Sequence, residues 1–260
     1  MKCKICNSST TVAFKNKILN KYNINYYKCT DCGFMFTEEP YWLNEAYASS
    51  INLSDTGIMS RNIFNAKLTT NLLYYIFDKN FKCVDYAGGY GIFTRLMRDC
   101  GFDFYWSDKY SQNLVARGFE FNHELEKIDL VTLFEVLEHL ENPKEDLKKI
   151  IEISDTLIFS TELIQEDVPN KDWWYYAFEH GQHISFYSEK TFNILANQLN
   201  VNYYKLNNNY HIFSKRKVNK YILKLLIGRF NYFFYRYALS KMQSLSWNDH
   251  IKMKNCENTL

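Results

Sequence analysis

The chain has 260 residues, 47% of them hydrophobic, and its 31 basic and 29 acidic residues leave a formal net charge of +2. This length and composition exclude a largely disordered chain and predict one principal domain with a small appendage. The near-neutral charge does not favour nucleic acid as the partner, because binding to a phosphate backbone depends on a strong basic excess.

The first ten residues, MKCKICNSST, have no apolar stretch of the kind that a secretory signal carries. The most apolar later stretch, residues 221–239, is interrupted by Lys224, Arg229 and Arg236, and charges near a bilayer centre are costly. We therefore expect a cytoplasmic protein in a reducing compartment, where paired cysteines bind metal more often than they form disulfides.

Four cysteines form two Cys-x-x-Cys pairs near the N-terminus: Cys3, Cys6, Cys29 and Cys32. Each pair places two sulfurs on one ion, and four thiolates complete the tetrahedral shell of Zn²⁺. An all-cysteine set leaves no open coordination position, so we expect the zinc to be structural. Residues 1–40 are thus predicted to form a zinc ribbon, with a short hairpin between the pairs.

A linker with large aromatic residues and a helical segment are predicted over residues 41–79. The helix is expected from Ser60, because apolar residues follow at four-residue spacing: Phe64, Leu68, Leu72 and Ile76.

From residue 81 the pattern changes to short strands that alternate with helices. Strands are expected at 81–87, 102–107, 129–134 and 156–160, and two further strands flank the turn at 207–209. Helices are expected at 92–100, from the Asn142-Pro143 start, and from Ser188. Such alternation predicts an α/β fold over residues 80–215, with a doubly wound, mostly parallel sheet and one antiparallel edge strand.

The segment from Asp85 to Gly91, Asp-Tyr-Ala-Gly-Gly-Tyr-Gly, joins the end of a strand to the start of a helix. Its small residues allow a ligand to approach the backbone, and the helix start favours negative charge. Asp108 ends the next strand, where a carboxylate can accept both hydroxyls of a ribose. Thr94 stands where a dinucleotide fingerprint needs its third glycine, so NAD is disfavoured.

This turn resembles the first motif of class I S-adenosylmethionine (SAM) dependent methyltransferases, with Ala87 in place of the first glycine. Residues 129–143, Asp-Leu-Val-Thr-Leu-Phe-Glu-Val-Leu-Glu-His-Leu-Glu-Asn-Pro, resemble the fourth-strand motif of the same family. The resemblance implies a Rossmann-like fold over residues 80–200 and SAM as the cofactor. The cofactor-binding residues that it implies are Asp85, Ala87, Gly88, Gly89, Gly91, Asp108, Phe134 and Glu135.

Residues 41–47, together with residues 54–57 and Arg61, resemble the segment that precedes the core in ribbon-bearing methyltransferases of surface-polysaccharide gene clusters. The resemblance predicts a lid in which Tyr47 and Arg61 reach the methionyl carboxylate of the cofactor. The alternative is a simple packing role for Trp42 and Tyr47.

Residues 173–187 are rich in aromatic side chains and histidines, and they follow the predicted fifth strand, at the edge where ligands bind in such sheets. We predict His183 as the general base and His180 as the second choice, because histidine titrates near the working pH. The alternative is that His183 only braces a loop. The predicted acceptor-binding residues are Trp173, Trp174, Tyr175, Tyr176 and His139.

Residues 183–188 also resemble the His-Leu-Ser-Tyr region of ribbon-bearing sugar C-methyltransferases. That family has glutamate at the position of Gln182 and tyrosine at the position of His180, so we expect O-methylation of a hydroxyl instead. Glu135, Glu138 and His139 resemble the Mg²⁺-binding Glu-x-x-Glu-His of quinone-precursor methyltransferases. We favour a hydrogen-bonded Glu138–His139 pair over the ion.

The C-terminal segment, residues 216–260, is basic and aromatic and is predicted to be an amphipathic helical segment. We expect it to pack on its own domain or on a second subunit in a homodimer. Peripheral contact with an anionic membrane is the alternative.

Together these features predict an enzyme that methylates a small molecule, namely a sugar or sugar nucleotide of surface-polysaccharide or related biosynthesis. One alternative is an rRNA methyltransferase, because a cysteine-rich zinc unit ahead of this fold also resembles such enzymes. Another is a non-catalytic protein that uses the SAM fold for interaction.

Overall fold

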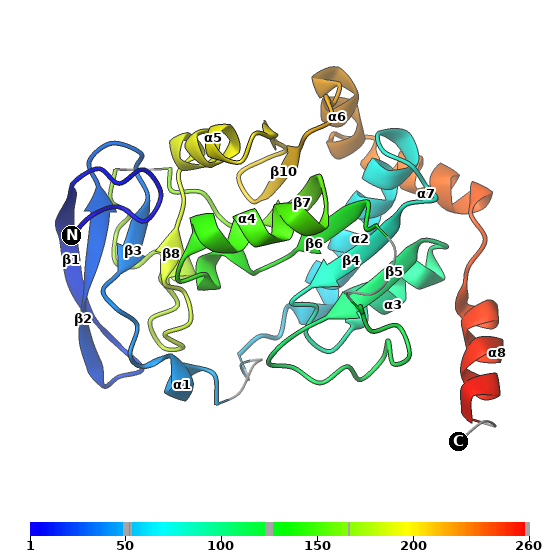
Figure 1. The fold of residues 1–260 in the computed structure, drawn as a ribbon, viewed down its shortest axis with the longest axis horizontal. Coiled ribbons are helices and arrows are strands. Elements are labelled where there is room, and N and C mark those ends of the chain that lie inside the picture. Colours follow the sequence, from blue (N-terminus) through cyan, green and yellow to red (C-terminus); the bar gives the residue numbers. More distant parts are fainter. Residues whose placement is uncertain (49–51, 53, 123–126, 166, 258–260) are drawn as a thin grey trace. The chain divides into compact units, whose positions relative to one another are not determined.

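The computed structural model describes residues 1–260 except 49–51, 53, 123–126, 166 and 258–260 (Figure 1). Its contacts form two compact units. Unit 1 comprises Met1–Asn52 and Leu133–Arg216, and unit 2 comprises Leu53–Thr132 and Lys217–Leu260. The segments expected from the sequence (1–40, 41–79, 80–215 and 216–260) stay predictions, and the last three include undescribed positions.

Unit 1 contains a four-stranded antiparallel sheet in the order β1-β2-β3-β8. Its strands are β1 (Thr10–Ile18), β2 (Tyr22–Cys29), β3 (Met35–Thr37) and β8 (Ser185–Phe186). The β1–β2 hairpin is the one expected between the cysteine pairs, whereas β8 comes from far along the chain. It pairs with β3 through Met35↔Phe186 and Phe36↔Ser185. The N-terminal ribbon therefore shares a sheet with the segment that follows His183.

An apolar core joins the same two parts of unit 1. It contains residues of the hairpin, of the segment after β3 and of the aromatic segment, namely Ile18, Ile24, Tyr26, Met35, Trp42, Ala46, Ile164, Tyr175, Tyr176, Ile184 and Phe186. The Phe14 and Tyr26 rings stack with centroids 4.5 Å apart, and Tyr26 meets Tyr176 edge-on at 5.8 Å. Burial of several large rings at one place stabilises the ribbon against the rest of unit 1.

The remaining elements of unit 1 are α1 (Leu43–Ala46), the 3-10 helices η1 (Leu137–His139) and η2 (Trp174–Tyr176), α4 (Pro143–Ile153), α5 (Glu189–Gln198), β7 (Thr156–Ser160), β9 (Asn202–Lys205) and β10 (Tyr210–Ser214). Helix α4 begins with proline at its first turn, and Ser188 caps α5 by accepting the Thr191 N–H. Both helix starts agree with the signals in the sequence.

Unit 2 contains α2 (Ile58–Tyr75), β4 (Lys82–Tyr86), α3 (Ile92–Asp99), β5 (Asp103–Ser107), α6 (Lys220–Ile227), α7 (Asn231–Lys241) and α8 (Ser246–Glu257). Helix α2 begins two residues before the expected Ser60. Of its four-residue repeat, Leu68 and Leu72 are buried, while Phe64 is exposed. The C-terminal segment consists of three helices, and Arg98 of α3 binds α8 through two bonds of 2.8 Å to the Asp249 carboxylate.

The main sheet has the strand order β5-β4-β6-β7-β10-β9, where β6 is Leu130–Leu133. Strand β4 is parallel to β5 and β6, and β10 is antiparallel to β7 and β9. Strands β6 and β7 are buried throughout, as expected for central strands covered on both faces. The predicted Rossmann-like α/β fold with an antiparallel edge is confirmed, and the edge is the β9–β10 pair.

Over the described part of the chain, every helix is too short or too polar to span a lipid bilayer.

Candidate functional site

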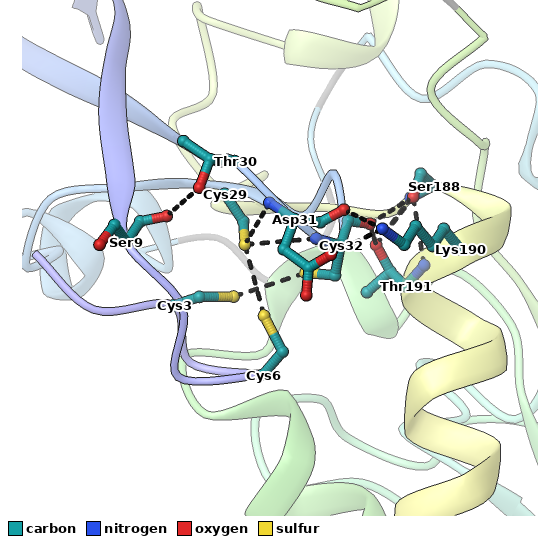
Figure 2. Close-up of polar contacts among 10 residues, drawn as sticks. All are labelled: Cys3, Cys6, Ser9, Cys29, Thr30, Asp31, Cys32, Ser188, Lys190 and Thr191. Atoms are coloured by element: carbon teal, nitrogen blue, oxygen red, sulfur yellow. Dashed lines mark hydrogen bonds and ion pairs between the residues drawn. The ribbon is translucent and has the colours of Figure 1, made fainter.

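The four cysteines of the N-terminal pairs lie together, as Figure 2 shows. All four sulfurs lie within 4.8 Å of one another; Cys3 Sγ is 3.6 Å from Cys32 Sγ, and Cys6 Sγ is 3.4 Å from Cys29 Sγ. A tetrahedral Zn²⁺ with bonds of about 2.3 Å holds its sulfurs about 3.8 Å apart, so the spacing suits this ion. All four are free cysteines, which leaves their sulfurs available as ligands.

The second cysteine pair is fixed to helix α5 by polar contacts (Figure 2). The Ser188 and Thr191 hydroxyls donate to the Cys32 carbonyl oxygen at 2.8 and 2.9 Å. Lys190 adds an ion pair of 2.7 Å with Asp31. Because Ser188 also caps α5, the start of this helix and the cysteine knuckle are positioned by the same side chain.

The glycine turn lies in unit 2 and connects β4 to α3, as the sequence predicts. Ala87, Gly89 and Gly91 have positive φ angles of 58°, 55° and 84°. A Cβ at Gly88 would come within 2.5 Å of Asp85 Oδ2, so this position requires glycine. Ala87 is exposed, and the turn presents backbone in place of long side chains. A ligand can therefore approach the main chain closely.

Asp85 lies beneath this turn and is buried. Its carboxyl accepts hydrogen bonds from the Thr94 and Thr132 hydroxyls, each at 3.1 Å. The pKa of Asp85 is raised to about 7, mainly by burial. The two hydrogen bonds oppose this rise, and the charge of Asp108 adds to it. Both carboxyl oxygens thus have partners inside the protein.

Asp108 follows β5 and is bonded to the same turn. Its Oδ2 accepts the Gly89 N–H at 2.9 Å, and its Oδ1 accepts the N–H groups of Tyr110 and Ser111 at 2.7 Å each. A carboxylate offers about four acceptor positions, so three bonds leave one for a ribose hydroxyl. Together with the exposed backbone of the turn, this fits the nucleoside of SAM.

The two residues predicted for the lid lie in different units. Tyr47 belongs to unit 1, where its hydroxyl is 3.0 Å from His139 Nδ1. Arg61 belongs to unit 2, where its guanidinium forms a 2.6 Å ion pair with Asp55. Tyr47 therefore has a contact with a predicted acceptor residue, and its role toward the cofactor stays a prediction, as does that of Arg61.

His183 has a defined tautomer. Its Nδ1 lies 2.7 Å from the carbonyl oxygen of Tyr175. Because a carbonyl oxygen only accepts, Nδ1 carries the proton and Nε2 keeps a lone pair. Burial lowers the pKa of His183 to about 4, so the imidazole is neutral near pH 7. This is the protonation state that a general base requires.

His139 lies beside it, with the two rings at a centroid distance of 5.0 Å and nearly perpendicular. His139 Nδ1 is 3.1 Å from the Gln182 carbonyl oxygen and 3.0 Å from the Tyr47 hydroxyl. The carbonyl oxygen only accepts, so this contact favours a proton on Nδ1 and a lone pair on Nε2, with the Tyr47 hydroxyl oxygen as a second acceptor. Burial, followed by the charge of His183, lowers the pKa of His139 to about 3. Both imidazoles are therefore neutral and both have a basic Nε2.

Glu138 completes this group of three, which we call the acceptor cluster: Glu138, His139 and His183. Their ligand atoms lie within 4.8 Å of one another. Glu138 is fully buried, and neither of its carboxyl oxygens makes a hydrogen bond of normal geometry with a described residue, although the nearby Tyr175 and Thr161 hydroxyls favour its charged form. Burial, strengthened by the charge of Glu135, raises its pKa well above the usual range. Such a carboxyl needs a proton, a bound hydroxyl or a cation.

Glu135 is engaged elsewhere. It adopts a φ of 56°, its N–H donates to Ser160 Oγ at 2.8 Å, and its own carboxylate accepts from that hydroxyl at 2.6 Å. The acceptor cluster thus has His183 as its third member, where the resemblance to Mg²⁺-binding enzymes pointed to Glu135. Phe134, the other residue expected beside the cofactor, has its ring 6.2 Å from that of Tyr210.

The four aromatic residues predicted to bind the acceptor differ in exposure. Trp174 is 68% exposed, whereas Tyr175 and Tyr176 are buried in the core of unit 1. Trp173 is partly buried, and its indole N–H donates to Glu162 at 3.2 Å. Of the four, Trp174 alone has a largely exposed side chain, and its ring meets that of Tyr175 edge-on at 5.2 Å. Tyr175 contributes its backbone carbonyl to orient His183.

His180 and Gln182 lie in the same segment with different surroundings. His180 Nε2 is 3.5 Å from a Glu179 carboxyl oxygen, and His180 is outside the acceptor cluster. The Gln182 side chain donates to the Ala46 carbonyl oxygen at 2.7 Å and accepts from Asn52 at 3.1 Å. An amide held this way has no proton-accepting role in chemistry.

Sequence reasoning missed the partners that orient the imidazoles. Tyr47 and His139 are 92 positions apart, and the other partners are backbone carbonyls. Backbone carbonyls carry no residue-type signal, so only the folded chain can reveal them.

These features define a class of protein. A sheet in this order, with a glycine turn after β4 and an acid after β5, is the fold of Rossmann-like SAM-dependent methyltransferases. A family model described as a methyltransferase domain matches residues 59–206, more than half of the chain. The chain belongs to this family, and it is an enzyme of SAM-dependent methyl transfer. No protein of curated function matches its sequence.

Solved structures with a similar fold include the magnesium protoporphyrin IX methyltransferase of Synechocystis PCC 6803, with 14% identity, 66% of this chain and 90% of that chain covered, and a TM-score of 0.45. A SAM-dependent methyltransferase of Thermotoga maritima, described as a possible histamine N-methyltransferase, is 12% identical and has a TM-score of 0.46. The match covers 68% of this chain and 97% of that chain. Human N-acetylserotonin methyltransferase has 14% identity, coverages of 59% and 51%, and a TM-score of 0.43. The chain thus spans about half the length of the human enzyme.

Proposed function

We propose that the protein transfers a methyl group from SAM to a hydroxyl of a small acceptor, a sugar or sugar nucleotide of surface-polysaccharide biosynthesis. The observation that carries this proposal is the basic Nε2 of His183, fixed by the 2.7 Å bond between Nδ1 and the Tyr175 carbonyl oxygen. The four cysteines would hold a structural Zn²⁺ in the ribbon.

On the donor side, the exposed backbone of the glycine turn would hold the methionyl end of SAM, above the Asp85 carboxyl. Asp108 would accept a ribose hydroxyl at its remaining acceptor position. When bound, SAM supplies an electrophilic methyl group on a sulfonium ion.

On the acceptor side, His183 Nε2 would take the proton of the attacking hydroxyl as the new carbon–oxygen bond forms. A protonated Glu138 would donate to the oxygen of that hydroxyl and orient it. The exposed indole of Trp174 would stack on a sugar. The bonded Gln182 amide supports O-methylation over C-methylation, since no second carboxylate stands at that position.

Two alternatives fit less well. Modification of rRNA would favour a basic surface, but the net charge is only +2. A non-catalytic role does not account for two neutral imidazoles beside a buried carboxyl that makes no hydrogen bond of normal geometry with a described residue.

The test is methyl transfer from labelled SAM to a panel of free sugars, nucleotide sugars and RNA. We expect turnover on a sugar hydroxyl, and we expect His183→Ala to lower kcat by about 10²–10⁴-fold because the base is lost. SAM affinity, measured by calorimetry, should stay the same, and His180→Ala is the matched control. Unchanged turnover in His183→Ala would remove His183 as the base, and methylation of RNA alone would overturn the acceptor class.

A second candidate role for the acceptor cluster is metal binding, favoured by the buried carboxyl of Glu138, which makes no hydrogen bond of normal geometry with a described residue. Two neutral imidazole nitrogens and a carboxylate suit Zn²⁺ or Fe²⁺ better than Mg²⁺, which prefers oxygen ligands. Metal analysis of the purified protein separates the roles. Metal binding is supported if the protein holds a second equivalent of metal that the His183→Ala variant lacks, and if a chelator abolishes turnover that the metal then restores. In that case a metal ion, and not His183 as a base, would act at this site.

A further inference from the structure

Helices α6 and α7 of unit 2 expose many large apolar side chains. The exposed fractions are 87% for Tyr221, 68% for Phe233, 60% for Phe230, 57% for Tyr232, 50% for Leu225 and 49% for Tyr237. Soluble proteins usually expose such residues singly, and a concentration of them indicates an interaction surface.

The exposed residues follow the helical repeat. Tyr221 and Leu225 are four residues apart on α6, and Phe233 and Tyr237 are four apart on α7, so each pair lies on one face of its helix. We use the name α6–α7 face for these exposed side chains together with Phe230.

Other side chains hold the two helices on unit 2. Leu223 and Leu226 of α6 and Ala238 of α7 are buried. In addition, the Tyr75 hydroxyl of α2 donates to the Phe234 carbonyl oxygen at 3.0 Å, and the two rings meet edge-on at 5.4 Å. The α6–α7 face is therefore not needed to attach these helices to their own unit.

The charge of the segment has one sign. Residues 217–248 contain no Asp or Glu and six basic residues: Lys217, Lys220, Lys224, Arg229, Arg236 and Lys241. Apolar side chains bordered by cations are typical of helices that lie in the interface of an anionic bilayer. A second copy of this face would bring the same positive charge against it, which opposes self-association.

We propose that the α6–α7 face docks on the surface of a bilayer containing anionic phospholipid. The apolar side chains enter the headgroup boundary, and the Lys and Arg side chains contact lipid phosphates. The contact is peripheral, since none of the described helices is long and apolar enough to cross a membrane. The proposal stands independently of the acceptor that the enzyme methylates.

The experiment is co-sedimentation of the full chain with vesicles of phosphatidylcholine alone and of equimolar phosphatidylglycerol and phosphatidylcholine. We expect binding to the anionic vesicles that weakens as salt rises. The double variant Phe230→Ser, Phe233→Ser should bind at least about tenfold more weakly, because two large apolar groups no longer enter the bilayer. Arg229→Gln with Arg236→Gln should weaken binding to the anionic vesicles by about tenfold.

Tyr41→Ser is the matched control, because Tyr41 of unit 1 is as exposed as Phe230, at 60%. It should bind vesicles like the unaltered chain. Thermal unfolding confirms that each variant folds, and the arginine variant decides the matter if the serine variant does not. The proposal is overturned if the chain does not bind vesicles or if all variants bind them equally. It is also overturned if the unaltered chain is a dimer and the serine variant is a monomer, or if the chain binds single-stranded RNA more tightly than vesicles.

Discussion

Two buried carboxyl groups, Asp85 in unit 2 and Glu138 in unit 1, belong to the two sequence motifs that resemble those of methyltransferases. They differ in their hydrogen bonding. Asp85 accepts hydrogen bonds from two threonine hydroxyls, so both of its carboxyl oxygens have partners within the protein. Glu138 makes no hydrogen bond of normal geometry with a described residue and lies beside two neutral imidazoles. In the proposed mechanism Asp85 thus belongs to a donor side whose buried carboxyl already has its hydrogen-bond partners. The acceptor side keeps unsatisfied groups where a substrate proton or a metal ion would be bound.

The largest effect that separates the two carboxyl sites should come from removing the Zn²⁺ proposed for the four cysteines. Stripping it with a chelator, or replacing Cys6 and Cys29 by serine, should destabilise the ribbon, because structural zinc supplies folding free energy of about 10 kcal/mol or more in small zinc domains. We expect turnover to fall by at least about 10²-fold, because β8, which follows His183, would lose its pairing with β3 and His183 would no longer be held in place.

SAM binding by calorimetry should fall far less, because the glycine turn and Asp108 lie in unit 2. Restoring Zn²⁺ to the chelated protein is the control. Equal loss of cofactor affinity and of turnover would show that the ribbon does not act selectively on the acceptor side, and an unchanged thermal stability would count against a structural zinc.

A smaller effect concerns the pH dependence that Asp85 gives to unit 2. Its pKa is raised to about 7 in the folded chain, so the folded state holds the proton more tightly than the unfolded state does. The free energy of unfolding should therefore fall as pH rises from about 4 to about 7, by no more than about 4 kcal/mol.

Asp85→Asn should remove this contribution and make the protein more stable at pH 8, measured by urea unfolding at several pH values. The exposed Asp172→Asn is the control and should leave the pH profile as it is. A parallel shift of the Asp85→Asn curve at every pH would contradict the assigned cause.

The smallest effect tests the ribose contact. Asp108→Ala removes the acceptor for a ribose hydroxyl and the three backbone N–H bonds, so SAM affinity should fall by about 10–100-fold in calorimetry. Glu120→Ala, which removes an acid from the segment after β5, is the comparison variant and should change affinity much less. An unchanged affinity in Asp108→Ala would place the cofactor elsewhere.

The sequence predicted the structure of the glycine turn better than the arrangement of the acceptor cluster, because the residues of the turn are continuous in the chain and those of the cluster are not. The turn from Asp85 to Gly91 is a continuous segment whose spacing fixes its geometry, and the strand and helix periods around it predicted the α/β fold. The acceptor cluster joins residues 138–139 to residue 183, and Tyr47 and two backbone carbonyls orient it. Nothing local in the sequence encodes those contacts.

The aromatic segment shows the same limit. Residue type alone treated Trp174 and Tyr175 alike, but the first is exposed and the second is buried. The three-helix division of the C-terminal segment and the Arg98–Asp249 contact also depend on tertiary packing, which overrides local pattern.

The pairing of β3 with β8 affects how this enzyme can be engineered. The register is set by only two residue pairs, Met35↔Phe186 and Phe36↔Ser185. A slip of one position would turn Phe186 from the core toward the opposite face and rotate the backbone that precedes it. The N-terminal forty residues are therefore unsuitable as an interchangeable cassette, and a chimera that exchanges them should also exchange residues 183–191 from the same parent.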